Sequence, residues 1–312
     1  MKRGVFINQV KANCSIYESG LMIKDCLVES DEYTLDYFET DPRLVQFYAN
    51  TGGKYDFYII NWHPHTLAIT NKYLDKLSAK IAIVLEVSPN EYAPMTPNRF
   101  DAYAIIDPTK ERTANYFPLP RPVLQLPTKP LLDDSKLVLG SFGLYNKQFK
   151  NEKRFDEIVE SANNSGRDCI VRINLPVASF TYTSLDEIKK YGDWLKSLAK
   201  PNVDIIITHD YMSREELVGW LSEHTMNCFP YYRERAGLSA VTDQAVSAGR
   251  AIMTTECNTF RHIHKYINHF PKESYEELSI STLTGVKKMQ EDWSPENFRK
   301  GFNNMLREMK IA

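Results

Sequence analysis

Residues 137–162 read LVLGSFGLYNKQFKNEKRFDEIVESA, and this stretch decides the fold. Its opening apolar run, 137–142, predicts a buried strand, and glycines then break the pattern. A lysine-rich turn follows, after which apolar side chains recur at helical spacing and predict a helix over 153–163. A strand, a glycine turn and a helix in this order are typical of a βαβ unit with parallel strands.

The same alternation runs along the rest of the chain. Apolar runs predict further strands at 4–7, 55–61, 80–87, 102–106, 169–174, 203–208, 225–230 and 251–254. Helical patterns occupy 21–28, 185–198, 213–222, 238–248 and 294–309, the last with Ser294 as its N-cap. A Ser- and Asn-containing turn is expected at 13–20, and the proline-rich segment 118–130 is expected to be an irregular linker.

These patterns predict an α/β protein with two Rossmann-like, doubly wound domains. We expect the first domain at 1–128 and the second at 129–293, with a C-terminal helix in 294–312 that packs back on the first domain. Ligands of such sheets bind beyond the carboxyl ends of the strands, so two domains predict a site in an interdomain cleft.

Composition restricts the class of protein. The chain has 38 basic and 40 acidic residues and a formal charge of -2, so no overall field selects nucleic acid or an acidic membrane. Its five scattered cysteines have no CxxC spacing, which favours reduced thiols in a cytosolic protein. We find no signal-peptide pattern and no apolar stretch of membrane-spanning length, and we expect a cytoplasmic protein.

Two stretches of the second domain are candidate ligand-binding segments. In YRERAGLSAVTDQAVSAGRAI, residues 232–252, a glycine and a serine open a predicted helix. The backbone amides at the start of this helix would bind a diphosphate, or Ser239 would simply serve as an ordinary N-cap. Glu234 lies just before this loop and could accept ribose or sugar hydroxyls. In GSFG, residues 140–143, glycines at a strand end allow close approach of a ligand, and the lysines that follow are either solvated or neutralise its phosphates.

Residues 137–263 resemble the retaining GT-B glycosyltransferases. The resemblance rests on GSFGLYNKQFKNEKRFDEIVESA, on SREELVGWLSEHTMNCFPYY and on RERAGLSAVTDQAVSAGRAIMTTE. It implies a nucleoside diphosphate sugar as donor, with UDP the expected nucleotide, and no obligatory metal or other cofactor. The chain departs from the family where a second glutamate is usual: Thr242 stands there, and Asp243 is the nearest later acid.

The resemblance also implies the donor-site residues. Lys153 is expected to contact the diphosphate, with Lys147 as an alternative, and Arg172 could hold a phosphate. The nucleotide base would lie near His209 and Tyr211. The full set is Gly140, Phe142, Gly143, Lys147, Lys153, Arg172, His209, Tyr211, Glu234, Gly237, Leu238, Ser239, Ala240 and Asp243.

The first domain is expected to bind the acceptor, with Glu18, His63 and Glu86 as candidate catalytic residues at strand ends. For His63, packing and acceptor binding remain equal alternatives, and a metal site with His65 lacks a third ligand. Trp62 is expected at the acceptor surface.

The predicted activity is that of a hexosyl- or pentosyltransferase. Its acceptor would be a small molecule, a glycan or, as in some compact viral enzymes, a hydroxymethylated base of DNA. Two rivals remain open: a non-catalytic two-lobed protein that binds a nucleotide or sugar, and a nucleotide-sugar epimerase. Transfer would rely on electrostatic stabilisation of the leaving group.

Overall fold

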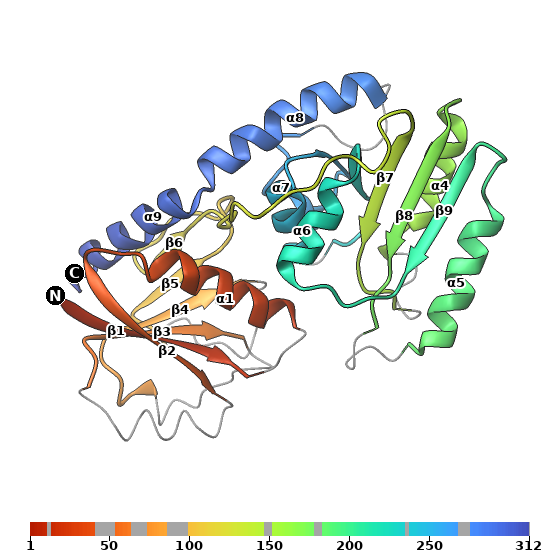
Figure 1. Cartoon of the computed structure of the whole chain (residues 1–312). Coiled ribbons are helices and arrows are strands. Elements are labelled where there is room, and N and C mark those ends of the chain that lie inside the picture. Colours follow the sequence, from red (N-terminus) through yellow and green to blue (C-terminus); the bar gives the residue numbers. More distant parts are fainter. Residues whose placement is uncertain are drawn as a thin grey trace. The chain divides into compact units, whose positions relative to one another are not determined.

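The structure is a computed structural model that describes residues 1–10, 14–40, 54–63, 74–85, 99–146, 152–177, 183–234, 237–267 and 275–311. The chain forms two compact units (Figure 1). The first unit contains Met1–Leu124, Ala236–Leu238 and Asp292–Ala312, and the second contains Gln125–Arg235 and Ser239–Glu291.

The first unit is built on a parallel sheet of six strands in the order β2-β1-β3-β4-β5-β6. The strands are β1 (Lys2–Gln9), β2 (Tyr33–Thr40), β3 (Phe57–Trp62), β4 (Lys80–Val84), β5 (Ala102–Ile105) and β6 (Tyr116–Pro118). Four of them confirm the predicted strands in this half of the chain. Strands β2 and β6 were not predicted, and they form the two edges of the sheet.

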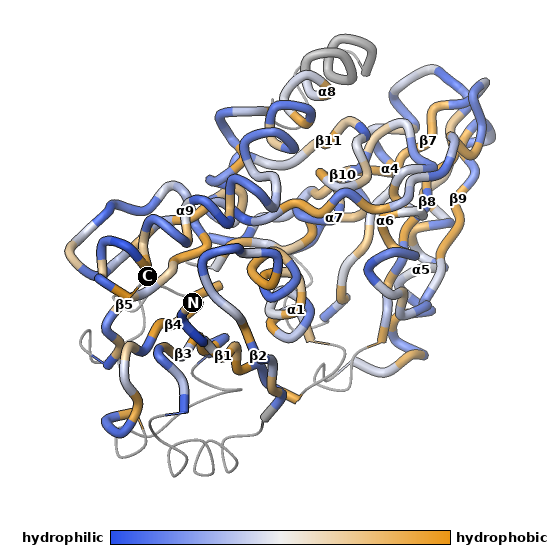
Figure 2. The backbone as a smooth tube through the Cα atoms, turned by 60° about the vertical axis from the view of Figure 1, so that its left-hand side comes forward, coloured by the Kyte–Doolittle hydropathy of each residue, from blue (hydrophilic) through white to orange (hydrophobic). Residues whose placement is uncertain are grey.

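Both faces of this sheet are buried, because alternate residues of the same strands enter two separate apolar clusters. Phe6 and Ile59 belong to one cluster, and Val5 and Ile60 belong to the other. Helices α1 (Ser15–Leu27) and α9 (Pro295–Glu308) contribute to the first cluster. Ser294 caps α9 as predicted, and the predicted apolar face of α9 is buried. Figure 2 colours the chain by hydropathy and shows hydrophobic stretches in the strands beside hydrophilic ones.

The second unit has a parallel sheet of five strands in the order β11-β10-β7-β8-β9. These strands are β7 (Leu137–Phe142), β8 (Cys169–Asn174), β9 (Val203–Thr208), β10 (Met226–Phe229) and β11 (Ala251–Thr254). Its helices are α4 (Phe155–Asn164), α5 (Leu185–Ser197), α6 (Arg214–Ser222), α7 (Val241–Ser247) and α8 (Tyr275–Asp292), with the 3-10 helix η3 at Asn258–Phe260. Every strand predicted here is confirmed, whereas α8 was not predicted.

Two local predictions are wrong. The turn expected at 13–20 is the start of α1, because Ile16 and Ile23 are buried on one face of a regular helix. Gly20 lies inside this helix, where a Cβ atom would come within 2.3 Å of the Asn61 amide nitrogen. The helix expected at 238–248 is shorter and begins only at Val241.

Gly140 was predicted at a strand end where a ligand could approach, but it lies inside β7 and packs under a buried ring. A Cβ atom there would come within 1.8 Å of His224 Nδ1, which hydrogen-bonds Asn227 at 2.8 Å. Gly140 is therefore a packing glycine rather than a ligand-binding one.

We expect Gly140→Ala to destabilise the second unit by about 1–3 kcal/mol, because the fixed imidazole cannot give way. Urea unfolding measures the change. Gly219→Ala is the matched control, since a Cβ atom in α6 meets only the flexible Lys129 side chain, at 3.3 Å. Equal stability of the two variants would contradict this account of Gly140.

Candidate functional site

The carboxyl end of β7 continues into a turn that only glycine can make comfortably. Gly143 has a φ of +153°, and a Cβ atom there would lie 2.5 Å from the Tyr231 phenol oxygen and 3.1 Å from Lys153 Nζ. The Tyr231 hydroxyl donates a 2.8 Å hydrogen bond to the carbonyl of Phe142. The turn after β7 and the residues after β10 thus meet around a buried phenol, 2% exposed.

Lys153 reaches into this turn from the segment before α4. Its Nζ donates to the Leu144 carbonyl at 2.9 Å and lies 4.8 Å from the centre of the Tyr231 ring. The backbone of Lys153 also forms an antiparallel bridge with Tyr231. One of the three ammonium donors is therefore used within the turn, and the other two have no acceptor among the described residues.

A second cation acts on Lys153. Burial, followed by the positive charge of Arg233, lowers the pKa of Lys153 to about 8, although Glu152 opposes this shift. Arg233 is half-buried, and its Nε has no hydrogen-bond partner in the described part of the chain. Two neighbouring cations beside a glycine turn form a site that favours a polyvalent anion, because such an anion would relieve their mutual repulsion.

Sequence reasoning identified Lys153 and Gly143 but missed Tyr231 and Arg233. The signal was the segment YYRER at 231–235, directly after β10. Residues that follow a strand of a parallel sheet lie at the edge where ligands bind, but only the parallel order β10-β7 shows that this segment adjoins the glycine turn.

The ends of β8 and β9 extend the same edge of the sheet. Asn174 Nδ2 donates to the Asp210 carbonyl at 3.0 Å, and its Oδ1 accepts from Thr208 at 3.0 Å. His209 Nδ1 lies 3.1 Å from the Leu175 carbonyl. Tyr211 is 45% exposed. The residues expected near a nucleotide base are thus placed where two adjacent strands end.

The loop before α7 differs from its prediction. The Ser239 amide donates to the Thr259 carbonyl at 3.1 Å, and the N-cap is Ala240, which makes no side-chain capping bond. The Ser239 amide is used in this hydrogen bond, and the helix that follows has only seven residues. Ser239 therefore does not form the anion site that was expected at a helix N-terminus. Thr259 is followed by Phe260, whose ring packs on Tyr231 at 5.6 Å, so this loop remains close to the glycine turn.

The remaining donor-site candidates of this region take different positions. The Glu234 carboxylate accepts a 3.4 Å hydrogen bond from the Asn258 amide and is otherwise exposed. Asp243 is buried in α7, 2% exposed, and is not a surface charge. Gly237 and Leu238 are buried and group with the first unit, and Lys147 lies outside the described residues.

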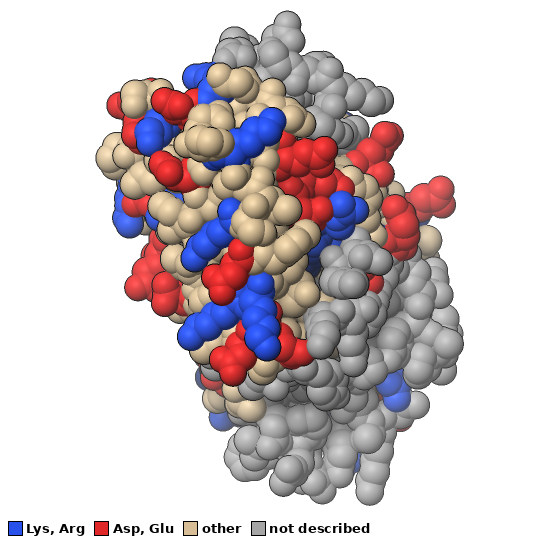
Figure 3. Space-filling view, turned by 90° about the vertical axis from the view of Figure 1, so that its right-hand side faces the viewer, with Lys and Arg blue, Asp and Glu red and all other residues tan. Residues whose placement is uncertain are grey.

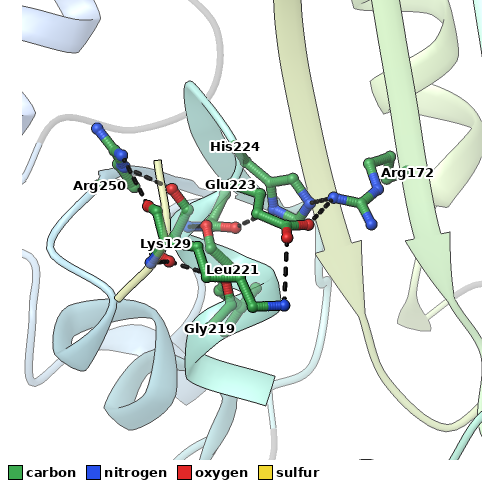
Figure 4. A network of polar contacts seen from close by, with 9 residues as sticks. Lys129, Arg172, Gly219, Leu221, Glu223, His224 and Arg250 are labelled. Atoms are coloured by element: carbon green, nitrogen blue, oxygen red, sulfur yellow. Dashed lines mark hydrogen bonds and ion pairs between the residues drawn. The ribbon is translucent and has the colours of Figure 1, made fainter. Parts of the chain in front are cut away.

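Arg172 does not extend toward a ligand as predicted. It lies in the middle of β8, and its guanidinium NH1 is 2.6 Å from the Glu223 carboxylate (Figure 4). The same carboxylate pairs with Lys129 at 3.3 Å, and the guanidinium stacks over Trp220 at 5.0 Å. Because Glu223 already neutralises Arg172, this arginine fastens β8 to the end of α6 instead of binding a phosphate.

In the first unit, Glu18 lies in the first turn of α1, and His63 directly follows β3. Both are half-buried, and Glu86 lies outside the described residues. Trp62 was predicted at a surface but is 4% exposed, because its side chain enters the core beneath the sheet. The five cysteines all lie in the described residues as buried thiols that form no disulfide.

The described residues contain no group of three His, Cys, Asp or Glu side chains arranged to hold a metal ion. Their helices include none that combines the length and the apolar character needed to cross a membrane.

The fold matches that of solved GT-B glycosyltransferases over nearly the whole chain. HepE of Anabaena, solved with UDP and glucose, superposes with a TM-score of 0.64 at 11% identity, covering 98% of this chain and 100% of that chain. WaaB, a lipopolysaccharide outer core galactosyltransferase, gives a TM-score of 0.59 at 11% identity, covering 98% and 99%.

A UDP-forming α,α-trehalose-phosphate synthase of Burkholderia xenovorans, in complex with glucose 6-phosphate, gives a TM-score of 0.61 at 9% identity, covering 99% of this chain and 100% of that chain. No protein-family model matches the sequence, and no curated protein matches it significantly. The two parallel sheets are therefore the two Rossmann-like domains of the GT-B fold, as the sequence predicted.

We expect the Lys153 ammonium to titrate near pH 8, well below its ordinary pKa of 10.5. NMR of lysine labelled at Cε measures the midpoint. Arg233→Gln should raise the Lys153 midpoint, because it removes the repelling charge. A Lys153 midpoint near the ordinary 10.5, unchanged in the variant, would show that the two cations do not act on each other.

Proposed function

We propose that the protein is a glycosyltransferase that transfers a sugar from a nucleoside diphosphate sugar to an acceptor hydroxyl. The observation that carries the proposal is the pair of cations, Lys153 and Arg233, beside the positive-φ turn at Gly143. A diphosphate bound there would receive ammonium and guanidinium hydrogen bonds at the carboxyl end of a parallel sheet, where such folds bind ligands.

The chemistry follows from that position. During transfer, the bond between the anomeric carbon and the diphosphate oxygen breaks, and its electron pair leaves with the nucleoside diphosphate. The acceptor oxygen forms the new bond to that carbon, and its proton passes to solvent or to a base. Negative charge therefore grows on the diphosphate, and Lys153 and Arg233 would stabilise it without a metal.

The structural relatives support a uridine nucleotide as donor, since HepE was solved with UDP and with UDP-glucose. A sugar or another small acceptor is favoured over duplex DNA. On the face drawn in Figure 3, basic and acidic side chains are interspersed over the described residues. A duplex-binding face would gather charge of one sign, and the overall charge is -2.

We expect UDP to bind the wild-type protein and to bind Lys153→Met and Arg233→Gln about 10- to 100-fold more weakly, the loss for a charge-assisted hydrogen bond of about 1.5–3 kcal/mol. Isothermal titration calorimetry gives the affinities. Lys189→Met, an exposed lysine of α5, is the matched control and should bind like the wild type. If no nucleoside diphosphate binds the wild type, or if the control loses as much affinity as Lys153→Met, the proposal fails.

The pH dependence of UDP binding should have a definite sign. Lys153 carries its charge below its pKa of about 8 and loses it above, so UDP affinity should fall as pH rises past 8. The bound diphosphate favours the charged lysine, so proton uptake should accompany binding near that pH. Titrations in buffers of different ionisation enthalpy measure the uptake. An affinity that is constant from pH 7 to about 9 would contradict the role of Lys153.

A further inference from the structure

A row of polar side chains crosses the carboxyl ends of three neighbouring strands of the first unit. Glu39 of β2 stands opposite Asn8 of β1 in the parallel register. The Asn61 amide of β3 donates to Asn8 Oδ1 at 2.7 Å. The row lies beside the first turns of α1, because Asn61 also donates to the Ile16 carbonyl at 2.8 Å, and Asn8 donates to the Tyr17 carbonyl at 3.1 Å.

Two phenols fix the carboxylate at the open end of this row. Tyr17 and Tyr37 both donate to Glu39 Oε1, at 2.8 Å and 2.9 Å. The hydrogen bond to Glu39 raises the pKa of Tyr17 to about 12, so this phenol stays protonated and continues to donate. No described residue donates to the other oxygen, Oε2, and Glu39 is exposed. One carboxylate oxygen is therefore held in place while the other is presented to solvent.

The buried part of the row has acceptors without donors. Gln9 and Asn61 are 1% and 0% exposed, yet Gln9 Oε1 and Asn61 Oδ1 accept no hydrogen bond from the described residues. Gln9 Nε2 donates a 3.3 Å hydrogen bond to the Cys14 sulfur, beside the start of α1. A buried carbonyl oxygen without a partner costs free energy, so this part of the row is rich in unused acceptors.

Among the described residues, the charge of the row disfavours anionic ligands. Glu39 is negative, and Lys24, the cation that stacks over the Tyr37 ring at 5.4 Å, pairs with Asp25. A phosphate or carboxylate at Glu39 Oε2 would meet a like charge and too few donors. A sugar without charged groups brings several hydroxyl donors and suits an edge rich in acceptors.

We propose that Glu39, held by Tyr17 and Tyr37, binds a hydroxyl of the acceptor, and that the acceptor is an uncharged sugar rather than a sugar phosphate or a uronic acid. This proposal rests on the proposed function and adds the class of the acceptor. Glu39 then orients the acceptor from the side of β2, at the same edge as the predicted candidates Glu18 and His63.

Saturation-transfer NMR with UDP present tests the proposal on the full chain. The probes are methyl glycosides of glucose, galactose and mannose, together with glucose 6-phosphate and glucuronate. We expect a neutral glycoside to bind the wild type, and Glu39→Gln to bind it about tenfold more weakly, as for loss of one charge-assisted hydrogen bond. Tyr37→Phe should weaken it less, because Tyr17 still holds Oε1. Glu111→Gln, an exposed acid of the same unit, is the control and should change nothing.

The outcomes separate the two proposals. UDP titrated into separate, ligand-free samples should bind Glu39→Gln as it binds the wild type, which also shows that the variant is folded. Three results would overturn the acceptor proposal alone. The phosphate or the uronate could bind more tightly than the neutral sugars, the affinity for neutral sugars could be the same in Glu39→Gln and the wild type, or none of the probes could bind. If the wild type does not bind UDP, the proposed function itself is rejected.

Discussion

The hydrogen bond from the Tyr231 phenol to the Phe142 carbonyl is the contact on which the candidate site depends. It joins Tyr231, two residues beyond β10, to the end of β7, and the phenol oxygen occupies the space that a side chain at position 143 would need. Burial raises the pKa of the phenol, so it stays a neutral donor. With the turn held in this way, Lys153 bonds the Leu144 carbonyl and lies over the same ring.

The parallel strands explain why the candidate site residues of each unit lie at one edge of its sheet. All strands of a parallel sheet end on the same side, so residues distant in sequence become neighbours there. In the second unit this edge collects two cations and a glycine turn. In the first unit it collects amides, phenols and the carboxylates of Glu39 and Glu18, and no such cation pair is found among its described residues. Under the two proposals, one edge would bind an anion and the other would bind hydroxyl groups.

Most of the fold could be predicted from the sequence, because buried strands are short apolar runs and capped helices carry their own signals. Strand β2 was missed since its polar residues alternate with apolar ones at the edge of the sheet, and the start of α1 was taken for a turn because of its small polar residues. The site was only half predictable. Lys153 follows a glycine turn and is visible in the sequence, whereas the pairing of Arg172 with Glu223 depends on contacts 51 residues apart.

The central claim is that one pair of cations binds the donor diphosphate. A crystal structure of the protein with UDP tests it most directly. We expect the diphosphate oxygens within about 3 Å of Lys153 Nζ and of the Arg233 guanidinium, with Gly143 in its positive-φ turn beside them. An ordered UDP bound elsewhere, with Lys153 still bonded only to the Leu144 carbonyl, would contradict the account.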